Sequence, residues 1–433
     1  MLRRWEYAVL GRPMPYRHDV LRAQKLSLLA GCAVAAGLLV LDTIMGLSGS
    51  AGIPGDAALL VSRQSGALFV RVDGRLHPVA NLASARLILG SPVTPAQVEE
   101  SALAAVAGGP TLGIPGAPRS LGEVISPSDS LWSVCDDAAG KTTVAVGGGW
   151  MPVVLDPAAA VVVTVAGGDG AVYLLYDGKR ALIDPGDPVT ARALRLEGRA
   201  VRTVSPALLN AIPEVPAISP PRIAGMGQPS GIASVPVGTI VRVLRTESPE
   251  YYVVLVDGFQ RVEHLTVDLL RFADRGGAAD IVDAAPEVIA RSPLVDTLPV
   301  ATFPDEPPSL LDVDDELCAT WQSGRSGIAV GPPATDGREP VTLAGTDGDG
   351  PGIDGVRMTP GRSLDVIDAA AGTRFLVTDA GVRFPVHDSA VVALGLTGTP
   401  AAAPWAIVGV LPAGPELARD AALIARDVLG SAP

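Results

Sequence analysis

The chain has 433 residues, of which 48% are hydrophobic, so it can build a sizeable core and is not an intrinsically disordered protein. It contains 49 glycines and 39 prolines but only 4% aromatic residues, which favours short strands and many turns over long helices. The net charge of -13 argues against a nucleic-acid partner, because an acidic surface repels phosphate backbones.

The N-terminus differs in charge from the rest of the chain. Residues 1–25 carry six basic residues against two acidic ones, so this stretch has a charge of +4 and the remainder has -17. The basic residues are Arg3, Arg4, Arg12, Arg17, Arg22 and Lys25. We expect residues 1–25 to be a cytosolic basic arm that sets membrane orientation.

Residues 26–47 form an apolar stretch that can cross a bilayer as a helix, for which about 20 residues are needed. Its one charged residue, Asp42, lies near the far end, where a carboxylate can reach the interface. A cleaved signal peptide is the alternative, but the apolar core is longer than that of a usual signal. Because the basic excess precedes the span, we predict a cytoplasmic N-terminus and an exterior body after about residue 48.

Four stretches of the body share one pattern, in which a tight turn joins two alternating apolar runs and a short apolar helix follows. They are residues 65–90 with Asp73 and Gly74, 172–196 with Asp177 and Gly178, a strand-rich segment 232–272 with Asp257 and Gly258, and 373–396 with Asp379 and Gly381. One ββα unit cannot bury both faces of its hairpin, so the copies should pack on one another or on the strands between them. The predicted fold class is a β-rich (α+β) domain with four ββα-type repeats behind a single transmembrane helix.

The stretches between the repeats are of three kinds. Residues 212–231 and 293–312 are spaced by prolines and indicate linkers or long ordered loops. Residues 313–372 contain part of a central strand-rich segment. The C-terminal segment 397–433 ends in a predicted amphipathic helix. Its apolar face would carry Leu417, Ala421, Ile424 and Val428.

The sequence CDDAAGKTT at residues 135–143 ends in the Gly-Lys-Thr of a phosphate-binding loop. Such a loop needs a glycine where this chain has Cys135, and a helix directly after it. Asp136 and Asp137 would repel a triphosphate, and the residues from Thr142 onward favour a strand. We therefore expect neither a nucleotide site here nor a cofactor.

The chain has three cysteines, and Cys32 lies within the apolar stretch 26–47. The other two, Cys135 and Cys318, lie in the exterior body and are expected to form a disulfide, with two free buried cysteines as the alternative. A bridge across a loop this long would contribute on the order of 5 kcal/mol in the chain-entropy model.

The remaining motif matches are incomplete. Residues 348–355 imitate a dinucleotide loop, and residues 347–358 imitate a calcium loop. Pro351 interrupts both patterns, and Met358 stands where calcium needs a bidentate carboxylate. An acidic surface turn is expected instead. His77, His264 and His387 fall in the hairpins, where hydrogen-bonded or solvated side chains are expected. The sequence thus predicts no catalytic residue and no metal site.

The arrangement of these features resembles the EccB component of the ESX (type VII) secretion systems of mycobacteria and related actinobacteria. The stretches that carry the resemblance are SGALFVRVDGRLHPVANLASARLILG at 65–90, GIPGAP at 113–118, LWSVCDD at 131–137 and a late ELCATW. The resemblance covers essentially the whole chain. It implies a single-pass inner-membrane subunit whose periplasmic part holds four repeats around a central β domain. The family's paired cysteines fall on Cys135 and Cys318.

The resemblance also implies a function and partners. The chain would be a structural and assembly subunit of the secretion channel, associating with EccC-like ATPase, EccD-like and EccE-like subunits and with other copies of itself. An ATPase activity has been discussed for the family, but the interrupted loop at 135–143 does not support it, and no enzyme is expected. Two alternatives come from other classes, namely an exterior module that binds peptidoglycan and a nucleotide hydrolase.

Overall fold

The computed structural model describes residues 5, 8–11, 20–48, 57–147, 153–274, 280–331, 339–348, 350–368 and 370–427. The basic residues Arg3, Arg4, Arg12 and Arg17 lie outside this part of the chain. The chain divides into two compact units, one of residues 1–78 and 94–110 and one of residues 79–93 and 111–433. Each unit is described by itself.

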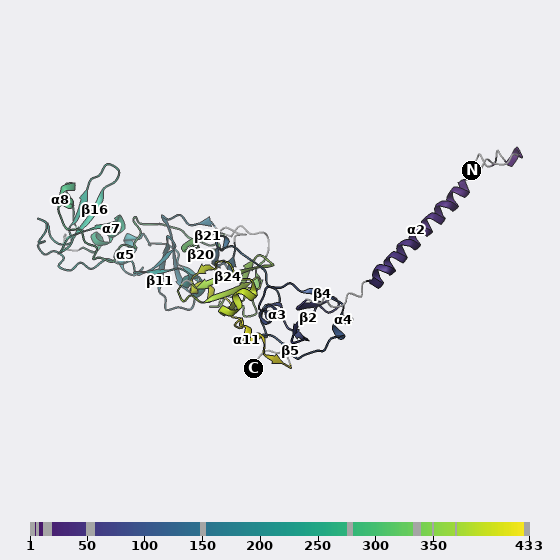
Figure 1. Ribbon diagram of the computed structural model, residues 1–433. Helices are drawn as coiled ribbons and strands as arrows, with labels where there is room; N and C mark the ends of the chain where they lie inside the picture. The colour runs from purple at the N-terminus through teal and green to yellow at the C-terminus, as the bar shows by residue number, and fades with distance from the viewer. Residues whose placement is uncertain are drawn as a thin grey trace. The chain divides into compact units, whose positions relative to one another are not determined.

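The predicted apolar stretch lies within helix α2 (Val20–Ser48), which is 29 residues long and includes Lys25 and the free Cys32 (Figure 1). Within the described residues, no helix combines the length and the apolarity that a membrane crossing requires.

The first unit contains a small sheet with the order β3-β2-β1-β4. The strands are β1 (Leu59–Ser62), β2 (Leu68–Val72), β3 (Arg75–Val79) and β4 (Ala96–Val98), and the helix is α4 (Glu100–Ala104). Strand β1 is antiparallel to β2 and parallel to β4. The unit's core is formed by Leu60, Leu76, Val98 and Leu103.

A seven-stranded sheet with the order β22-β23-β8-β7-β20-β21-β9 lies at the centre of the second unit. Its strands are β7 (Trp132–Asp136), β8 (Thr142–Val146), β9 (Val153–Val154), β20 (Leu317–Gln322), β21 (Arg325–Val330), β22 (Val341–Thr342) and β23 (Gly355–Met358). Strand β7 pairs with β8 on one side and with β20 on the other. The central sheet therefore joins segments that are far apart in the sequence.

Three smaller sheets complete the second unit. One has β10 (Ala159–Val165), β11 (Val172–Tyr176), β12 (Lys179–Ile183), β13 (Arg202–Val204), β14 (Glu214–Val215) and β19 (Ser309–Leu310). The next has β15 (Ile240–Val243), β16 (Glu250–Val254), β17 (Phe259–Val262) and β18 (Ile281–Asp283). The last has β24 (Arg362–Asp368), β25 (Arg374–Thr378), β26 (Arg383–Pro385), β27 (Ala401–Ala403) and β6 (Glu123–Val124).

One order of elements occurs in four segments: three successive strands, a helix, a short strand parallel to the first, and a second short helix. We number these segments one to four, and they are residues 59–104, 159–211, 240–290 and 362–408. The predicted stretches cover the hairpin and first helix of each segment. The predicted strand-rich segment 232–272 also contains β15, the first strand of the third segment. The three-residue parallel strand was missed in each segment, because so short a strand shows no alternating pattern.

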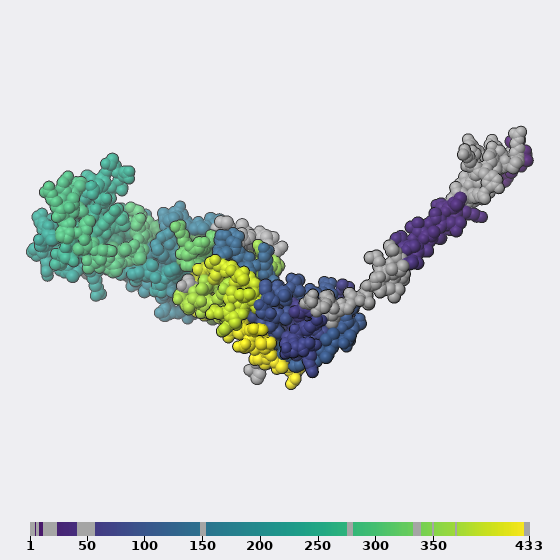
Figure 2. All heavy atoms as spheres, in the orientation of Figure 1, coloured from purple at the N-terminus to yellow at the C-terminus, as the bar shows by residue number. Residues whose placement is uncertain are grey.

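Helices of different segments pack against each other in the second unit. Helix α3 (Leu82–Leu89) packs on α9 (Val391–Leu394) and on α11 (Arg419–Ala422). Helix α5 (Pro188–Ala193) packs on α7 (His264–Ala273), and the second and third segments form a continuous teal-to-green surface in Figure 2. Helix α6 (Pro206–Ala211) packs on α10 (Trp405–Val408). The other elements are β5 (Thr111–Leu112), α8 (Pro286–Ala290), β28 (Ala425–Arg426) and the 3-10 turns Pro127–Asp129 and Asp388–Ala390.

The main core of the second unit lies between the central sheet and the helices of the second and fourth segments. Trp132, Val144, Leu208, Leu364 and Ile407 belong to this one cluster and are at most 1% exposed. A second cluster joins the second and third segments, and it contains Ala193 of α5, Leu194 directly after it, and Leu265 and Leu269 of α7. Burial of apolar side chains, at about 25 cal/mol per Å², is what holds the segments together.

The predicted hairpin turns are built in different ways. Asp73 and Gly74 have φ values of +49° and +77°, and Asp177 and Gly178 have +41° and +68°, as expected for two-residue turns that match strand twist. Gly381 also has a positive φ of +77°. Gly258 does not, and it is required for another reason, because a Cβ there would lie 2.7 Å from the Pro293 carbonyl oxygen.

Two expectations for the C-terminal half are wrong. The amphipathic helix carrying Leu417, Ala421, Ile424 and Val428 is reduced to the four-residue α11, and residues 425–426 form β28. The amide of Leu417 donates to Pro385, so the chain is already held extended there, and Val428 lies outside the described residues. The central segment 313–372 is also too long, because β24 within it pairs with β25 and belongs to the fourth segment.

The proline-spaced stretch 293–312 is an ordered loop and not a linker. It buries Leu298, Val300 and Phe303, and its strand β19 pairs with β10. The side chain of Gln260 holds it, accepting from the amide of Leu298 at 2.7 Å and donating to the carbonyl oxygen of the same residue at 3.0 Å. Gln260 thus acts as a short stretch of strand backbone.

Candidate functional site

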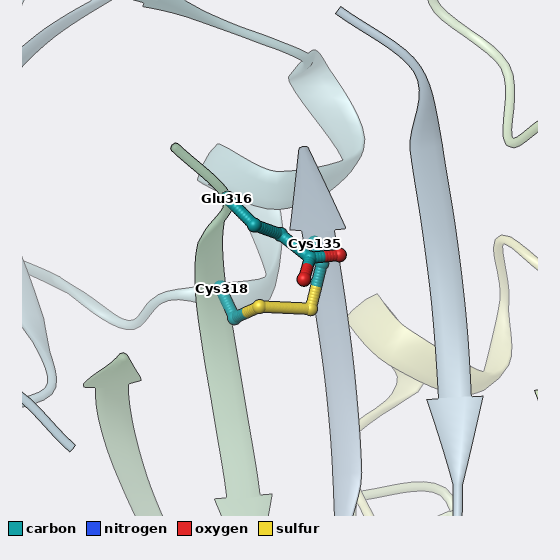
Figure 3. Close-up of side chains that lie close together, drawn as sticks. All are labelled: Cys135, Glu316 and Cys318. Atoms are coloured by element: carbon teal, nitrogen blue, oxygen red, sulfur yellow. A yellow bond between two sulfur atoms is a disulfide. The ribbon is translucent and has the colours of Figure 1, made fainter. Parts of the chain in front are cut away.

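The cysteines of the body form a disulfide at the centre of the second unit. Strands β7 and β20 are antiparallel neighbours, and Cys135 lies directly opposite Cys318 with their Cα atoms 4.0 Å apart. The sulfurs are bonded (Figure 3), and both residues are buried, at 2% and 0% exposed. The predicted disulfide is therefore confirmed. It links residues 183 positions apart, which is why the chain-entropy model assigns it about 5 kcal/mol.

A carboxylate accompanies the disulfide. Glu316 points toward the two sulfurs in Figure 3, and ligand atoms of the three residues lie within 4.8 Å of one another. Burial raises the pKa of Glu316, although the Arg357 guanidinium nearby acts in the opposite direction. The sulfurs are bonded to each other and offer no thiolate, so this trio does not constitute a metal site while the bond is intact.

Asp136, the residue after Cys135, connects the central sheet to the second segment. It is 2% exposed, and its carboxylate accepts from the hydroxyl of Thr142 at 2.9 Å and from the amide and hydroxyl of Ser205 at 2.6 and 2.8 Å. Ser205 also caps helix α6, because its hydroxyl accepts from the amide of Leu208. Burial raises the pKa of Asp136, and the hydrogen bonds from Ser205 and Thr142 oppose that rise.

Arg202 closes the other side of this junction. Its guanidinium donates to the carbonyl oxygens of Val313 and Asp136, each at 2.9 Å. Burial lowers the pKa of Arg202, although the Asp136 carboxylate acts to raise it. A pocket of about 440 Å³ opens beside it, and its lining includes Asp137, Gly140 and Asp314. Because three aspartates, Asp136 among them, line this pocket beside the one arginine, it disfavours a phosphate ligand.

The Gly-Lys-Thr turn is closed by its own acidic residue. One oxygen of Asp137 accepts from the amides of Ala139 and Lys141, at 2.8 and 2.9 Å. The amide of Asp137 donates back to Lys141, and that of Gly140 donates to Asp137. These are the amides that a phosphate cradle would have to direct at its ligand.

Asp354 completes the turn from a distant part of the chain. It is 6% exposed and accepts from the amide of Thr142 at 2.8 Å, the hydroxyl of Thr346 at 2.5 Å and the amide of Gly348 at 2.7 Å. Burial acts to raise the pKa of Asp354, but these hydrogen bonds together outweigh it and leave the pKa lowered. Asp354 lies in the stretch expected to be an acidic surface turn, and no local sequence pattern indicates its buried role.

The turn is thus a structural element and not a phosphate-binding loop. The residues after it form strand β8, as predicted, and no helix follows. The amides of Asp137, Ala139, Gly140, Lys141 and Thr142 all have protein acceptors. The arrangement joins strands β7 and β8 to the capped N-terminus of helix α6 by hydrogen bonds. It provides no site for a triphosphate.

The hairpin histidines are hydrogen-bonded, as expected. The Nδ1 atom of His77 lies 2.9 Å from the Pro110 carbonyl oxygen, and that of His264 lies 2.8 Å from the Glu306 carboxylate. His387 caps the turn that begins at Asp388. In the part of the chain that the structure describes, the histidines join no cluster of potential metal ligands.

Comparison with known proteins extends these findings over the whole chain. The family model described as "Type VII secretion system ESX-1, transport TM domain B" matches residues 1–431. A relative named "ESX-3 secretion system ATPase EccB3", from Mycolicibacterium smegmatis, is 35% identical over 450 residues, covering 96% of this chain and 86% of the relative. "ESX-5 secretion system ATPase EccB5" from Mycobacterium tuberculosis is 32% identical over 447 residues, covering 94% of this chain and 88% of the relative.

Solved structures agree with this result. A chain in the structure of an intact ESX-5 inner membrane complex superposes with a TM-score of 0.73 at 31% identity, covering 100% of this chain and 94% of that one. The structure of an EccB3 dimer from the ESX-3 core complex gives a TM-score of 0.73 at 33% identity, covering 85% of this chain and 100% of that one. With a family model matching nearly every residue and the same fold along its length, this chain belongs to the EccB family of type VII secretion systems.

Proposed function

We propose that the chain is a structural and assembly subunit of a type VII secretion channel in the inner membrane, with a periplasmic body that contacts other subunits. The observation that carries this proposal is the match along the entire chain to a subunit of an intact ESX-5 inner membrane complex. The absence of a recognisable catalytic motif in the sequence is consistent with it.

The topology belongs to the same proposal. Residues 26–47, within helix α2, would form a single membrane span, with the basic arm 1–25 in the cytoplasm and the body in the periplasm. The oxidised Cys135–Cys318 pair supports an extracytoplasmic body, because disulfides persist in oxidising compartments.

The four segments of common element order are, in this proposal, repeats of one unit arranged around the central sheet. Because helices of different segments pack on each other, we propose that the edge strands and turns of the segments make the contacts with other chains. A relative has been solved as a dimer, and this supports self-association through the body. EccC-like ATPase, EccD-like and EccE-like subunits are the partners proposed from the family.

The names of these two relatives contain the word ATPase. For this chain we propose no nucleotide hydrolysis at the Gly-Lys-Thr turn, because Asp137 and Asp354 occupy its amides. The substitution Lys141→Ala should leave any residual hydrolysis in a purified preparation unchanged. A loss of hydrolysis in that variant, with folding preserved, would refute this part of the proposal.

Purification of the native membrane complex tests the function itself. An affinity tag at the C-terminus should recover an EccC-like ATPase and an EccD-like subunit with the chain. The control is a tagged variant that lacks residues 1–20 but keeps Arg22 and Lys25 for orientation; it should insert and self-associate but lose the cytosol-facing subunits. If the intact chain purifies alone while those subunits purify together without it, the proposed function is wrong.

A further inference from the structure

Arg86 in helix α3 carries a half-buried positive charge that no acidic side chain among the described residues neutralises. It stands in the last turn of the helix, where Ala85 and Leu87 on either side are fully buried. Its Nε donates to the carbonyl oxygen of Val93 at 3.3 Å. Burial lowers the pKa of Arg86, and no carboxylate among the described residues counteracts this effect.

Other half-buried arginines of the second unit have partners. Arg374 forms an ion pair with Asp365 and also donates to the Leu396 carbonyl oxygen. Arg180 pairs with Glu214 at 3.0 Å. Arg383 donates to the Leu411 carbonyl oxygen at 3.0 Å and stacks over an aromatic ring. The terminal nitrogens of Arg86 differ because they have no acceptor within the described part of the chain, although guanidinium groups seldom stay without one when desolvated.

The Arg86 side chain lines a pocket of about 280 Å³. Four of the nine other lining residues are leucines, and they are Leu121, Leu376, Leu394 and Leu396. The Ser363 hydroxyl in the lining donates to the Gly122 carbonyl oxygen, so it is already engaged. Glu123 also lines the pocket, but it is engaged by Arg362. The pocket therefore places the Arg86 cation, which has no acidic partner among the described residues, beside a group of leucine side chains in a mixed polar and apolar lining. It is below the usual size range for a whole drug-sized ligand.

An exposed strand edge lies beside this pocket. Strand β6 pairs with β24 only, among the described strands. The amides of Glu123 and Ile125 donate to the Gly361 and Ser363 carbonyl oxygens, at 3.0 and 2.8 Å. Since successive amides of a strand point to opposite sides, the amide of Val124 between them points away from β24. An extended chain lying along β6 could pair with it.

We propose that this pocket binds the C-terminal residue of an extended peptide that ends in an aliphatic side chain. The terminal carboxylate pairs with the Arg86 guanidinium, the aliphatic side chain enters the leucine wall, and the peptide backbone runs along β6. Guanidinium and carboxylate are complementary through two parallel hydrogen bonds, and the partly desolvated setting strengthens them. A peptide is favoured over a free aliphatic acid because only a peptide also uses the edge of β6.

Ligand-observed NMR titration of the purified full-length chain tests this proposal. The probes are an acetylated tripeptide acid ending in leucine, its C-terminal amide, and 4-methylpentanoate, which has the carboxylate and the branched chain but no peptide backbone. We expect the tripeptide acid to bind at least about tenfold more tightly than the amide, because the amide lacks the charge that Arg86 pairs with. It should also bind more tightly than 4-methylpentanoate.

Two variants and a control complete the experiment. Arg86→Met keeps the length of the side chain but removes the charge, and should weaken the tripeptide acid at least about tenfold. Arg119→Met removes the same charge from an exposed arginine of the same unit and should change nothing. Leu121→Phe fills the pocket while Arg86 remains, so it should also abolish binding if Arg86→Met fails to fold.

Three results would overturn the proposal. Equal binding of the acid and the amide removes the role of the carboxylate. Binding that survives both Arg86→Met and Leu121→Phe places the peptide elsewhere. Equal binding of 4-methylpentanoate and the tripeptide acid makes the ligand a free aliphatic acid and removes the peptide. None of these results affects the proposed role in the secretion complex, which the co-purification tests separately.

Discussion

The central sheet and the third segment, residues 240–290, belong to one unit but are stabilised differently. Around the central sheet the bonded residues are distant in sequence, with 183 positions between Cys135 and Cys318 and 212 between Thr142 and Asp354. Between the third segment and the loop that follows it, the bonded residues are nearer in sequence, with 38 positions between Gln260 and Leu298. The distant contacts use a covalent bond and buried carboxylates, while the nearer ones use the neutral side chain of Gln260 and exposed ion pairs such as Arg242–Asp283.

The difference follows from the entropy of closing loops. Bringing together residues that are far apart in the chain costs more conformational freedom, and a covalent bond removes that cost from the unfolded state. A segment that folds from nearby strands has less to overcome, so apolar burial and a few hydrogen bonds are sufficient. We therefore expect that substitutions in the central sheet destabilise the whole second unit, and that substitutions in the third segment cause only local unfolding.

Removal of the disulfide should have the largest effect. Cys318→Ser is expected to lower the free energy of unfolding by up to about 5 kcal/mol, measured by denaturant titration without reductant. The matched control is Cys32→Ser, which removes the free thiol in α2 and should leave the unfolding of the body unchanged. Protease-nicked native protein should also separate into fragments only on reducing gels. Identical migration with and without reductant would contradict the role of the bond.

Asp354 sharpens the comparison through its pH dependence. Its folded pKa is lowered from 3.8, so its ionised form stabilises the protein above the unfolded pKa, and this contribution is lost as the pH falls through the folded pKa. The effect of Asp136 on the pH dependence of stability has the opposite sign. Its folded pKa is raised, so its contribution to stability is present below the unfolded pKa and is lost as the pH rises through the folded pKa.

Asp354→Asn should therefore reduce stability at pH 7 by about 2–3 kcal/mol, since its amide nitrogen cannot accept the bonds now made by the carboxylate. The variant should also lose less stability than the native chain between pH 5 and pH 3. Melting temperatures across that range measure both effects, and the exposed Asp420→Asn is the control. An acid transition as steep as that of the native chain would show that another group governs it.

Gln260→Ala should have a smaller and local effect. Truncation leaves the amides of Thr297 and Leu298 and one carbonyl group without their partner, which costs about 2 kcal/mol. Hydrogen exchange should accelerate at residues 297–300 while the strands β7 and β20 keep their protection. Gln228→Ala, an exposed glutamine in the preceding loop, serves as the control. Equal acceleration in the central sheet would mean that the two regions do not unfold independently.

Local patterns were sufficient for part of this fold. The hairpins at Asp73 and Asp177 could be located because a two-residue turn is specified by adjacent residues, and the strand after Thr142 follows from its β-branched residues. The disulfide partners could be named because the body has only two cysteines. Family membership could be inferred because whole stretches such as residues 65–90 are distinctive.

Tertiary contacts decided the rest. The short parallel strand of each segment forms only against a neighbour, and three residues contain no periodicity to reveal it. The helix predicted at the C-terminus gave way to β28 because pairing with β5 outweighs a weak local preference. Asp354 and Gln260 show no signal in the sequence, since their partners are fixed by the fold and not by spacing. Chain-local physics thus determined the turns and hairpins, while burial and long-range pairing determined where each polar side chain is used.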